Sequence, residues 1–254
     1  MRVGRVLGAV AALPIAFAAL LGVEAAVASR REYVPDDPGY LVQARVEPRG
    51  SSHDGAPLRL VMLGDSTVAG LGSPTAESSL AVLTAQRVAD RLGRSVEVRG
   101  LGVSGARTAD VRDEQLPQVS PGEVDVLVVV VGSNDVTHLT PPWHFDDVTR
   151  SMLERARAAG APVILGGIPL FGGVTALDQP LRWAVDRSAC VLRGIQVRTA
   201  QRVRGVTFVD IAAQASPRFV GVPDAMSSDG FHPAPTGYGF WADALAPAAA
   251  DAAG

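Results

Sequence analysis

Ser66 is the side chain whose sequence context best suits a nucleophile. It follows Gly64 and Asp65 at the point where residues 58–63, a run that is apolar apart from Arg59, give way to small and polar residues. At a turn from strand to helix, the free backbone N–H groups of the helix would face an anion formed beside the hydroxyl. Asp and Ser are also common helix caps, so the tripeptide alone is more typical of that structural role than of a nucleophile.

A serine nucleophile needs a general base, and the base needs an acid that orients it. Two aspartates precede a histidine by three residues, giving the pairs Asp135 and His138, and Asp229 and His232. The first pair follows an apolar run, where a capped loop with a surface histidine is the simpler interpretation. The second pair lies in a loop rich in Gly and Ser that Pro233 ends. The sequence therefore favours the second pair, while the first stays an alternative that mutation of each histidine would separate.

Composition excludes several other kinds of chemistry. All 23 basic residues are Arg, which excludes lysine nucleophiles, Schiff bases and the P-loop of NTPases. The single cysteine, Cys190, allows no internal disulfide and no Cys-based zinc site, and no His-Glu-x-x-His motif occurs. A net charge of −3 argues against a nucleic-acid partner. We expect no metal and no organic cofactor.

Residues 100–105 match the pattern G-x-G-x-x-G, which is typical of dinucleotide-binding loops. No acidic residue ends the next predicted strand, as that function would need. We interpret the glycines instead as allowing close approach of backbone to a substrate oxygen. A G-x-S-x-G elbow is also absent, which disfavours an ordinary α/β-hydrolase.

Strand-like and helix-like segments alternate from residue 58 onward. The predicted strands cover residues 58–63, 95–101, 124–131, 162–168 and 206–211. The predicted helices cover residues 80–92, 108–116, 145–159, 181–203 and 235–250. This alternation predicts an α/β fold with a parallel sheet covered on both faces, and such sheets bind ligands beyond the carboxyl ends of their strands.

The N-terminus has the pattern of an export segment. Arg2 and Arg5 precede a run without charge, residues 6–23, and Ala26-Val27-Ala28 suits cleavage before Ser29. The run is also long enough to anchor the chain in a membrane. We therefore expect a signal peptide or anchor at 1–28, a linker at 29–57 with one short ordered piece near residues 40–46, and a catalytic domain at 58–254. The protein would then be secreted or held on the outer face of the cytoplasmic membrane.

The ordered set Gly64-Asp65-Ser66, Gly105, Gly132-x-Asn134-Asp135 and Asp229-x-x-His232 resembles the SGNH, or GDSL-type, hydrolase family. The resemblance implies a three-layer, flavodoxin-like fold with a five-stranded parallel sheet. It also implies Ser66 as nucleophile, His232 as base and Asp229 as its orienting acid. The backbone N–H groups of Ser66 and Gly105 and the side-chain amide of Asn134 would form the oxyanion hole.

The expected activity is hydrolysis of small-molecule or lipid carboxylic esters through an acyl-enzyme. Carbohydrate O-deacetylation, thioester cleavage and lysophospholipid cleavage would use the same residues and remain alternatives. A membrane-anchored binding module without turnover is the non-enzymatic alternative, against which the intact set of Ser66, Asn134, Asp229 and His232 argues.

Overall fold

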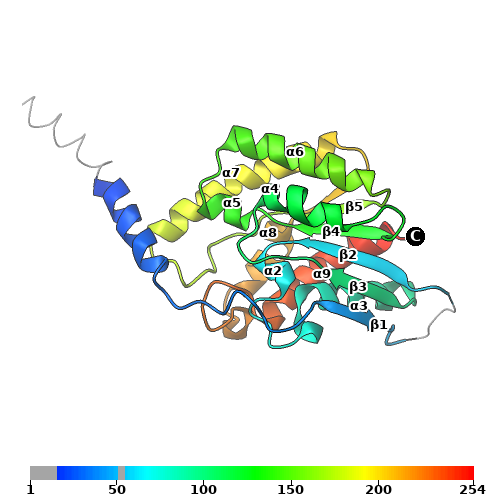
Figure 1. Ribbon diagram of the computed structural model, residues 1–254. Coiled ribbons are helices and arrows are strands. Elements are labelled where there is room, and N and C mark those ends of the chain that lie inside the picture. The colour runs from blue at the N-terminus through cyan, green and yellow to red at the C-terminus, as the bar shows by residue number, and fades with distance from the viewer. Residues whose placement is uncertain (1–15, 51–54) are drawn as a thin grey trace, which may run out of the picture.

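The computed structural model describes residues 16–50 and 55–254 (Figure 1). Their sheet has six strands in the order β1-β3-β2-β4-β5-β6. The strands are β1 (Gln43–Val46), β2 (Leu58–Gly64), β3 (Val96–Gly100), β4 (Val126–Val130), β5 (Val163–Gly166) and β6 (Val206–Val209). The five strands from β2 to β6 are parallel, as expected, and β1 pairs antiparallel with β3 at one edge.

Helices cover both faces of this sheet. The longer ones are α3 (Leu80–Leu92), α6 (Pro142–Ala158), α7 (Leu181–Arg202) and α9 (Pro235–Asp251). The short ones are α2 (Ser66–Ala69), α4 (Thr108–Asp110), α5 (Ser133–Thr137) and α8 (Ile211–Gln214). Figure 1 shows α6 and α7 on one side of the strands and α3 and α9 on the other. The predicted three-layer α/β/α architecture is therefore confirmed.

Successive side chains of each central strand pack against the helix layers on opposite faces of the sheet. In β2, Leu60 and Met62 pack in the cluster formed with α3 and α9, whereas Val61 and Leu63 pack in the cluster formed with α6 and α7. All five residues of β4 are buried in the same alternating way. Successive side chains of a strand point to opposite faces, so a strand between two helix layers must be apolar throughout.

The sixth strand departs from the predicted five-stranded sheet. β1 falls within the range expected as a linker, at the short piece expected to be ordered, and its residues alternate between exposed and half-buried. An edge strand of four residues with one solvated face leaves only a weak apolar pattern in the sequence. Val42 O accepts a hydrogen bond from Gly100 N at 2.8 Å just before this pairing begins. The chain ahead of the predicted domain thus joins the sheet.

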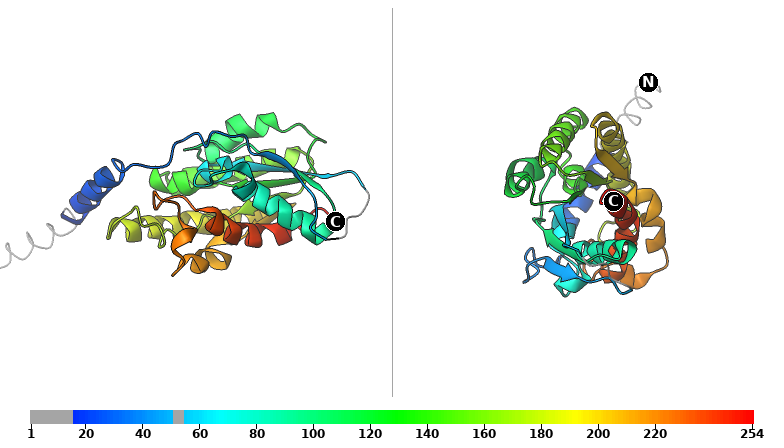
Figure 2. Two further views of the ribbon diagram at one scale, coloured as in Figure 1. Left: turned by 90° about the horizontal axis from the view of Figure 1, so that it is seen from below. Right: turned by 90° about the vertical axis from the view of Figure 1, so that its right-hand side faces the viewer.

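Residues 16–28 form a helix that projects from one end of the domain, whereas the C-terminus lies at the other (Figure 2). Its last turn contacts the domain, because Glu24 Oε2 accepts a hydrogen bond from Leu181 N at 2.7 Å and Ala28 is buried. Within residues 16–50 and 55–254, no helix has the length and apolar character needed to cross a membrane. The first 15 residues of the predicted export segment, and His53 in the predicted linker, lie outside the described residues.

Candidate active site

Ser66 begins α2 directly after β2, and Asp65 holds this turn. The Asp65 carboxylate caps the helix by accepting hydrogen bonds from Thr67 N at 3.0 Å and Thr67 Oγ1 at 2.7 Å. Burial raises the pKa of the Asp65 carboxyl, and the bonds from Thr67 oppose that shift. Gly64 is needed because a Cβ there would lie 2.7 Å from Val68 Cγ2. Asp65 is thus the helix cap, and the Ser66 hydroxyl remains free for another partner.

His232 is that partner. His232 Nε2 lies 3.1 Å from Ser66 Oγ, and His232 Nδ1 lies 2.7 Å from Asp229 Oδ2. The Asp229 side chain is 2% exposed and that of His232 is 9% exposed. A carboxylate can only accept, so Nδ1 carries the proton that it donates to Asp229. Nε2 is then left with its lone pair facing the Ser66 hydroxyl.

The Asp229 carboxylate is held by an unusually complete set of donors. Oδ1 accepts from Ser227 Oγ at 2.7 Å, Phe231 N at 2.8 Å and His232 N at 3.0 Å, and Oδ2 also accepts from Val34 N at 3.3 Å. Burial alone would raise the pKa of this carboxyl, but the hydrogen bonds from His232, Ser227 and Phe231 bring it well below its usual range. Asp229 is therefore ionised and fixed in orientation at neutral pH.

Two segments at the same end of the sheet carry two of the three predicted oxyanion donors, Gly105 and Asn134. Asn134 is the second residue of α5, beyond β4, and lines the cavity beside Ser66. Its Nδ2 donates to Ala106 O at 3.0 Å, which ties it to the loop that carries Gly105. Gly105 has a φ of +77°, a conformation that favours glycine, and the space where its Cβ would be is open. The predicted donors thus lie on neighbouring, hydrogen-bonded segments.

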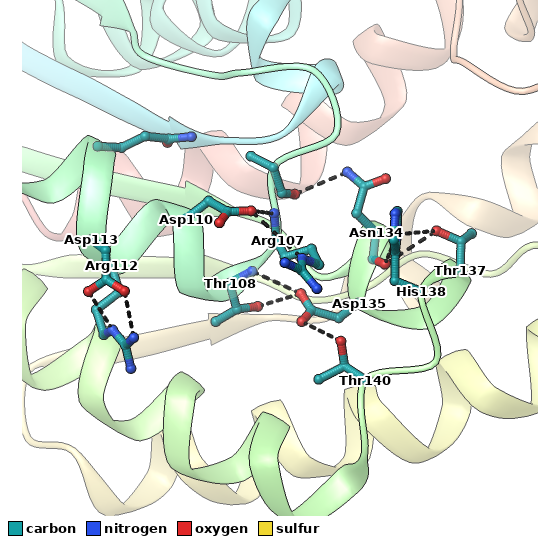
Figure 3. Close-up of polar contacts among 12 residues, drawn as sticks. Arg107, Thr108, Asp110, Arg112, Asp113, Asn134, Asp135, Thr137, His138 and Thr140 are labelled. Carbon is teal, nitrogen blue, oxygen red and sulfur yellow. Dashed lines mark hydrogen bonds and ion pairs between the residues drawn. The ribbon is translucent and has the colours of Figure 1, made fainter.

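The other Asp and His pair does not form such a contact (Figure 3). Asp135 Oδ2 accepts from Thr108 N at 2.9 Å and Thr108 Oγ1 at 2.8 Å, and Oδ1 accepts from Thr140 Oγ1 at 3.1 Å. His138 is exposed, and its Nδ1 lies 2.8 Å from Asn134 O. The buried carboxylate therefore fastens α4 to α5, and His138 lies at the surface.

An apolar cavity of about 300 Å³ opens beside Ser66 and His232. Its walls come from the segments that follow β5 and α8 and from one face of α9. They include Leu170, Phe171, Val174, Phe219, Val220 and Trp241. A larger depression of about 770 Å³ lies along β1 and β3, and none of the candidate residues lines it. Among residues 16–50 and 55–254, no group of three or more His, Cys, Asp or Glu side chains is arranged to hold a metal ion.

Sequence reasoning missed several residues that support this site. Gln115, which is buried, donates through Nε2 to Gly64 O at 2.7 Å and accepts from Gly64 N at 2.9 Å. Gln115 follows the charged residues Arg112, Asp113 and Glu114, so nothing in the sequence marks it as a buried residue. Ser227 and Val34 support Asp229, and Val34 does so through its backbone amide, which has no sequence signature at all.

Residues 62–240 match the model of the GDSL-like lipase/acylhydrolase family. The chain is 30% identical over 198 residues to the GDSL-like esterase Rv1075c of Mycobacterium tuberculosis, covering 77% of this chain and 62% of that protein. It is also 30% identical over 180 residues to the esterase TesA of Pseudomonas aeruginosa, covering 69% of this chain and 79% of that protein. The match thus spans less than two thirds of the mycobacterial relative.

Solved structures share the fold. LAE5, an alpha/beta hydrolase enzyme from the metagenome of Lake Arreo, superposes with a TM-score of 0.61 at 21% identity, covering 79% of this chain and 98% of that one. The acetylxylan esterase Axe2 from Geobacillus stearothermophilus gives a TM-score of 0.53 at 22% identity, and the superposition covers 75% of this chain and 93% of that one. The chain belongs to the GDSL-like lipase/acylhydrolase family, which confirms the resemblance seen in its motifs.

Proposed function

We propose that this protein is an exported serine esterase that hydrolyses carboxylic esters through Ser66, His232 and Asp229. The proposal is carried by one observation, the continuous contact from Ser66 Oγ through the imidazole to the Asp229 carboxylate at the mouth of an apolar cavity. Membership of an acylhydrolase family and similarity to two curated esterases support the same reaction class.

Acylation begins when Ser66 Oγ attacks the ester carbonyl carbon and its proton passes to His232 Nε2. Asp229 keeps the imidazole in the required tautomer and stabilises the imidazolium. The tetrahedral intermediate collapses as the C–O bond to the alcohol breaks, and His232 returns the proton to the departing alkoxide oxygen. A water molecule then attacks the acyl-enzyme with the same base, which releases the carboxylic acid and restores Ser66.

Negative charge on the carbonyl oxygen requires donors that face it in the transition state. Ser66 N, Gly105 N and Asn134 Nδ2 are the groups that the chain offers for this purpose. One such donor is typically worth about 3 kcal/mol in the transition state. The bond from Asn134 Nδ2 to Ala106 O uses one of two amide protons, so the second remains available to a substrate.

The cavity favours an acyl chain over a sugar. Its walls are mainly aliphatic and aromatic, and the hydroxyls of a carbohydrate would lose their water without finding enough partners there. An acyl chain would gain about 0.8 kcal/mol per buried methylene, or roughly fourfold in kcat/KM. We expect kcat/KM to rise from acetate to medium-length acyl esters.

A panel of p-nitrophenyl esters tests the function, with lysophospholipid, thioester and acetylated xylo-oligosaccharide as competing substrates. The parent protein is expected to hydrolyse medium-chain esters best, and Ser66→Ala is expected to be inactive with an unchanged melting temperature. Hydrolysis retained by Ser66→Ala contradicts the proposed nucleophile. A preference for the acetylated sugar over every acyl ester contradicts the proposed substrate class.

Export and membrane contact rest on the N-terminal sequence. Arg2 and Arg5, the uncharged run at 6–23 and the small residues before Ser29 support a secreted protein or one anchored on the outer face of the cytoplasmic membrane. N-terminal sequencing of the native protein separates the two, since a start at Ser29 means cleavage and a start at Met1 or Arg2 means a retained anchor. Recovery of the native protein from the cytoplasm contradicts export.

A further inference from the structure

Residues 33–42, here called the strap, lie ahead of the segment that matches the family and cross two loops of the candidate site. The strap begins after the helix at 16–28 and ends where Val42 O accepts from Gly100 N beside β3. Both of its ends are therefore attached to the domain, and the residues between them run past the segments that carry the candidate site.

The first contact of the strap is with the loop that carries Asp229 and His232. Val34 N donates to Asp229 Oδ2 at 3.3 Å, on the same oxygen that receives His232 Nδ1. The Tyr33 ring meets the Phe231 ring edge-on with centroids 5.6 Å apart, and Phe231 meets the His232 ring at 5.1 Å. The strap thus contacts Asp229 directly through the backbone of Val34, and it contacts His232 indirectly, through Tyr33 and Phe231.

The second contact is with the loop that carries Gly105. Ser104 Oγ donates to Asp36 Oδ1 at 2.7 Å, and Ser104 directly precedes Gly105. A third contact lies beyond it, where Tyr40 Oη donates to Gly70 O at 2.9 Å at the end of the helix that Ser66 begins. The strap therefore touches the segments of the acid and base, of one oxyanion donor and of the nucleophile.

We propose that the strap is a positioning element that sets the Asp229 loop and the Gly105 loop in register with Ser66. The proposal rests on the proposed function, since it concerns the same site. Oxyanion donors and an orienting acid act on the transition state and contribute little to substrate binding. Loosening the strap is therefore expected to lower kcat and to leave KM nearly unchanged.

Asp36 provides the cleanest test because it is exposed and, among the described residues, its side chain bonds only to Ser104 of the Gly105 loop. Asp36→Ala is expected to lower kcat about fivefold, a small part of the roughly hundredfold loss typical of removing an oxyanion donor. Asp36→Asn keeps an acceptor for Ser104 Oγ and is expected to restore most of the rate. Asp37→Ala is the matched control, because in the described part of the chain the Asp37 side chain accepts only from Gly39 N, within the strap, at 2.8 Å.

Val34 tests the other contact. Val34→Pro removes the N–H that donates to Asp229, whereas Val34→Ala keeps it and controls for the lost side chain. We expect a lower kcat for the proline variant alone, at unchanged KM. The melting temperature of each variant is measured alongside, and if Val34→Pro does not fold, Asp36→Ala decides the question.

The outcomes separate this proposal from the function on which it rests. A parent-like kcat in Asp36→Ala, or a loss that Asp37→Ala shares, overturns the strap as a positioning element while Ser66→Ala still reports the function. A rise in KM without a fall in kcat also overturns it, because the strap would then act on binding. Activity in Ser66→Ala instead removes the proposed nucleophile, whatever the strap variants do.

Discussion

Two regions of this protein carry the same pair of residues at the same spacing and use them differently. Asp229 and His232 share a hydrogen bond of 2.7 Å, and His232 reaches Ser66 on its other side. Asp135 gives both of its oxygens to threonines, and the His138 ring lies 2.8 Å from a backbone oxygen at the surface. The residue types fit a catalytic pair in both regions, but Asp229 Oδ2 faces the imidazole, whereas both oxygens of Asp135 face Thr108 and Thr140.

The largest difference in kcat is expected between variants of the two histidines. His232→Ala removes the base and is expected to lower kcat by about 10⁴-fold or more, as in other serine hydrolases that lose the triad histidine. His138→Ala is expected to keep kcat within about twofold, since surface substitutions away from special features have small effects. Steady-state hydrolysis of one medium-chain ester measures both. An inactive His138→Ala enzyme reverses the assignment of the two pairs.

The two aspartates should separate activity from stability. Asp229→Asn is expected to lower kcat by about 10⁴-fold, because the amide can hold the imidazole in the wrong tautomer. Asp135→Asn replaces an acceptor of Thr108 and Thr140 in a buried site, and is expected to cost about 1–3 kcal/mol of unfolding free energy. Urea unfolding and kinetics are measured on both variants. Equal losses of kcat with equal stability would show that the two carboxylates do not differ in role.

A smaller loss of kcat is expected at Asn134, the predicted oxyanion donor beside Asp135 and His138. Asn134→Ala should lower kcat by about 10²–10³-fold with little change in KM, because the amide acts on charge that develops in the transition state. Thr137→Ala, on the same short helix, is the matched control, because the Thr137 hydroxyl lies 3.3 Å from Asn134 O and 3.4 Å from His138 Nδ1 and does not line the cavity. A rise in KM with an unchanged kcat would contradict an oxyanion role for Asn134.

The smallest expected effect is the pH dependence of the stability that the Asp229 carboxylate contributes. Hydrogen bonds outweigh burial and lower the pKa of the Asp229 carboxyl in the folded state. Its stabilising contribution is therefore complete above the unfolded-state pKa of about 3.9 and is lost as the pH falls below that value. The difference in unfolding free energy between the parent and Asp229→Asn should shrink below about pH 4. Urea titrations across this range check it, and a difference independent of pH argues against the depressed pKa.

Much of the fold was predictable because its central strands are buried on both faces. The predicted strand at 124–131 contains β4, Val126–Val130, and the predicted helix at 235–250 matches α9, Pro235–Asp251. Helix α6 begins at Pro142, earlier than the predicted 145, because proline is well suited to the first helical turn. The edge strand β1 was weakly marked because only one of its faces is covered.

The candidate site also contains residues that the sequence marks clearly and residues that it does not mark. Residue type and position after a strand or in one polar loop single out Ser66, Asp229 and His232 as candidates, whereas the role expected for Asn134 comes from the resemblance to the SGNH family. Val34 and Gln115 were not predictable, because they act by contacts with Asp229 and Gly64 that are far away in sequence. A backbone amide that supports a carboxylate leaves no trace in residue types, and only the folded chain shows it.

The most direct test is labelling with a fluorophosphonate, which reacts with an activated serine hydroxyl, followed by peptide mapping. The contact from Ser66 through His232 to Asp229 predicts one label per chain, located on Ser66. His138→Ala should label as the parent does, and His232→Ala should not label. A label on Ser104, or none on the folded parent, would contradict Ser66 as the activated nucleophile.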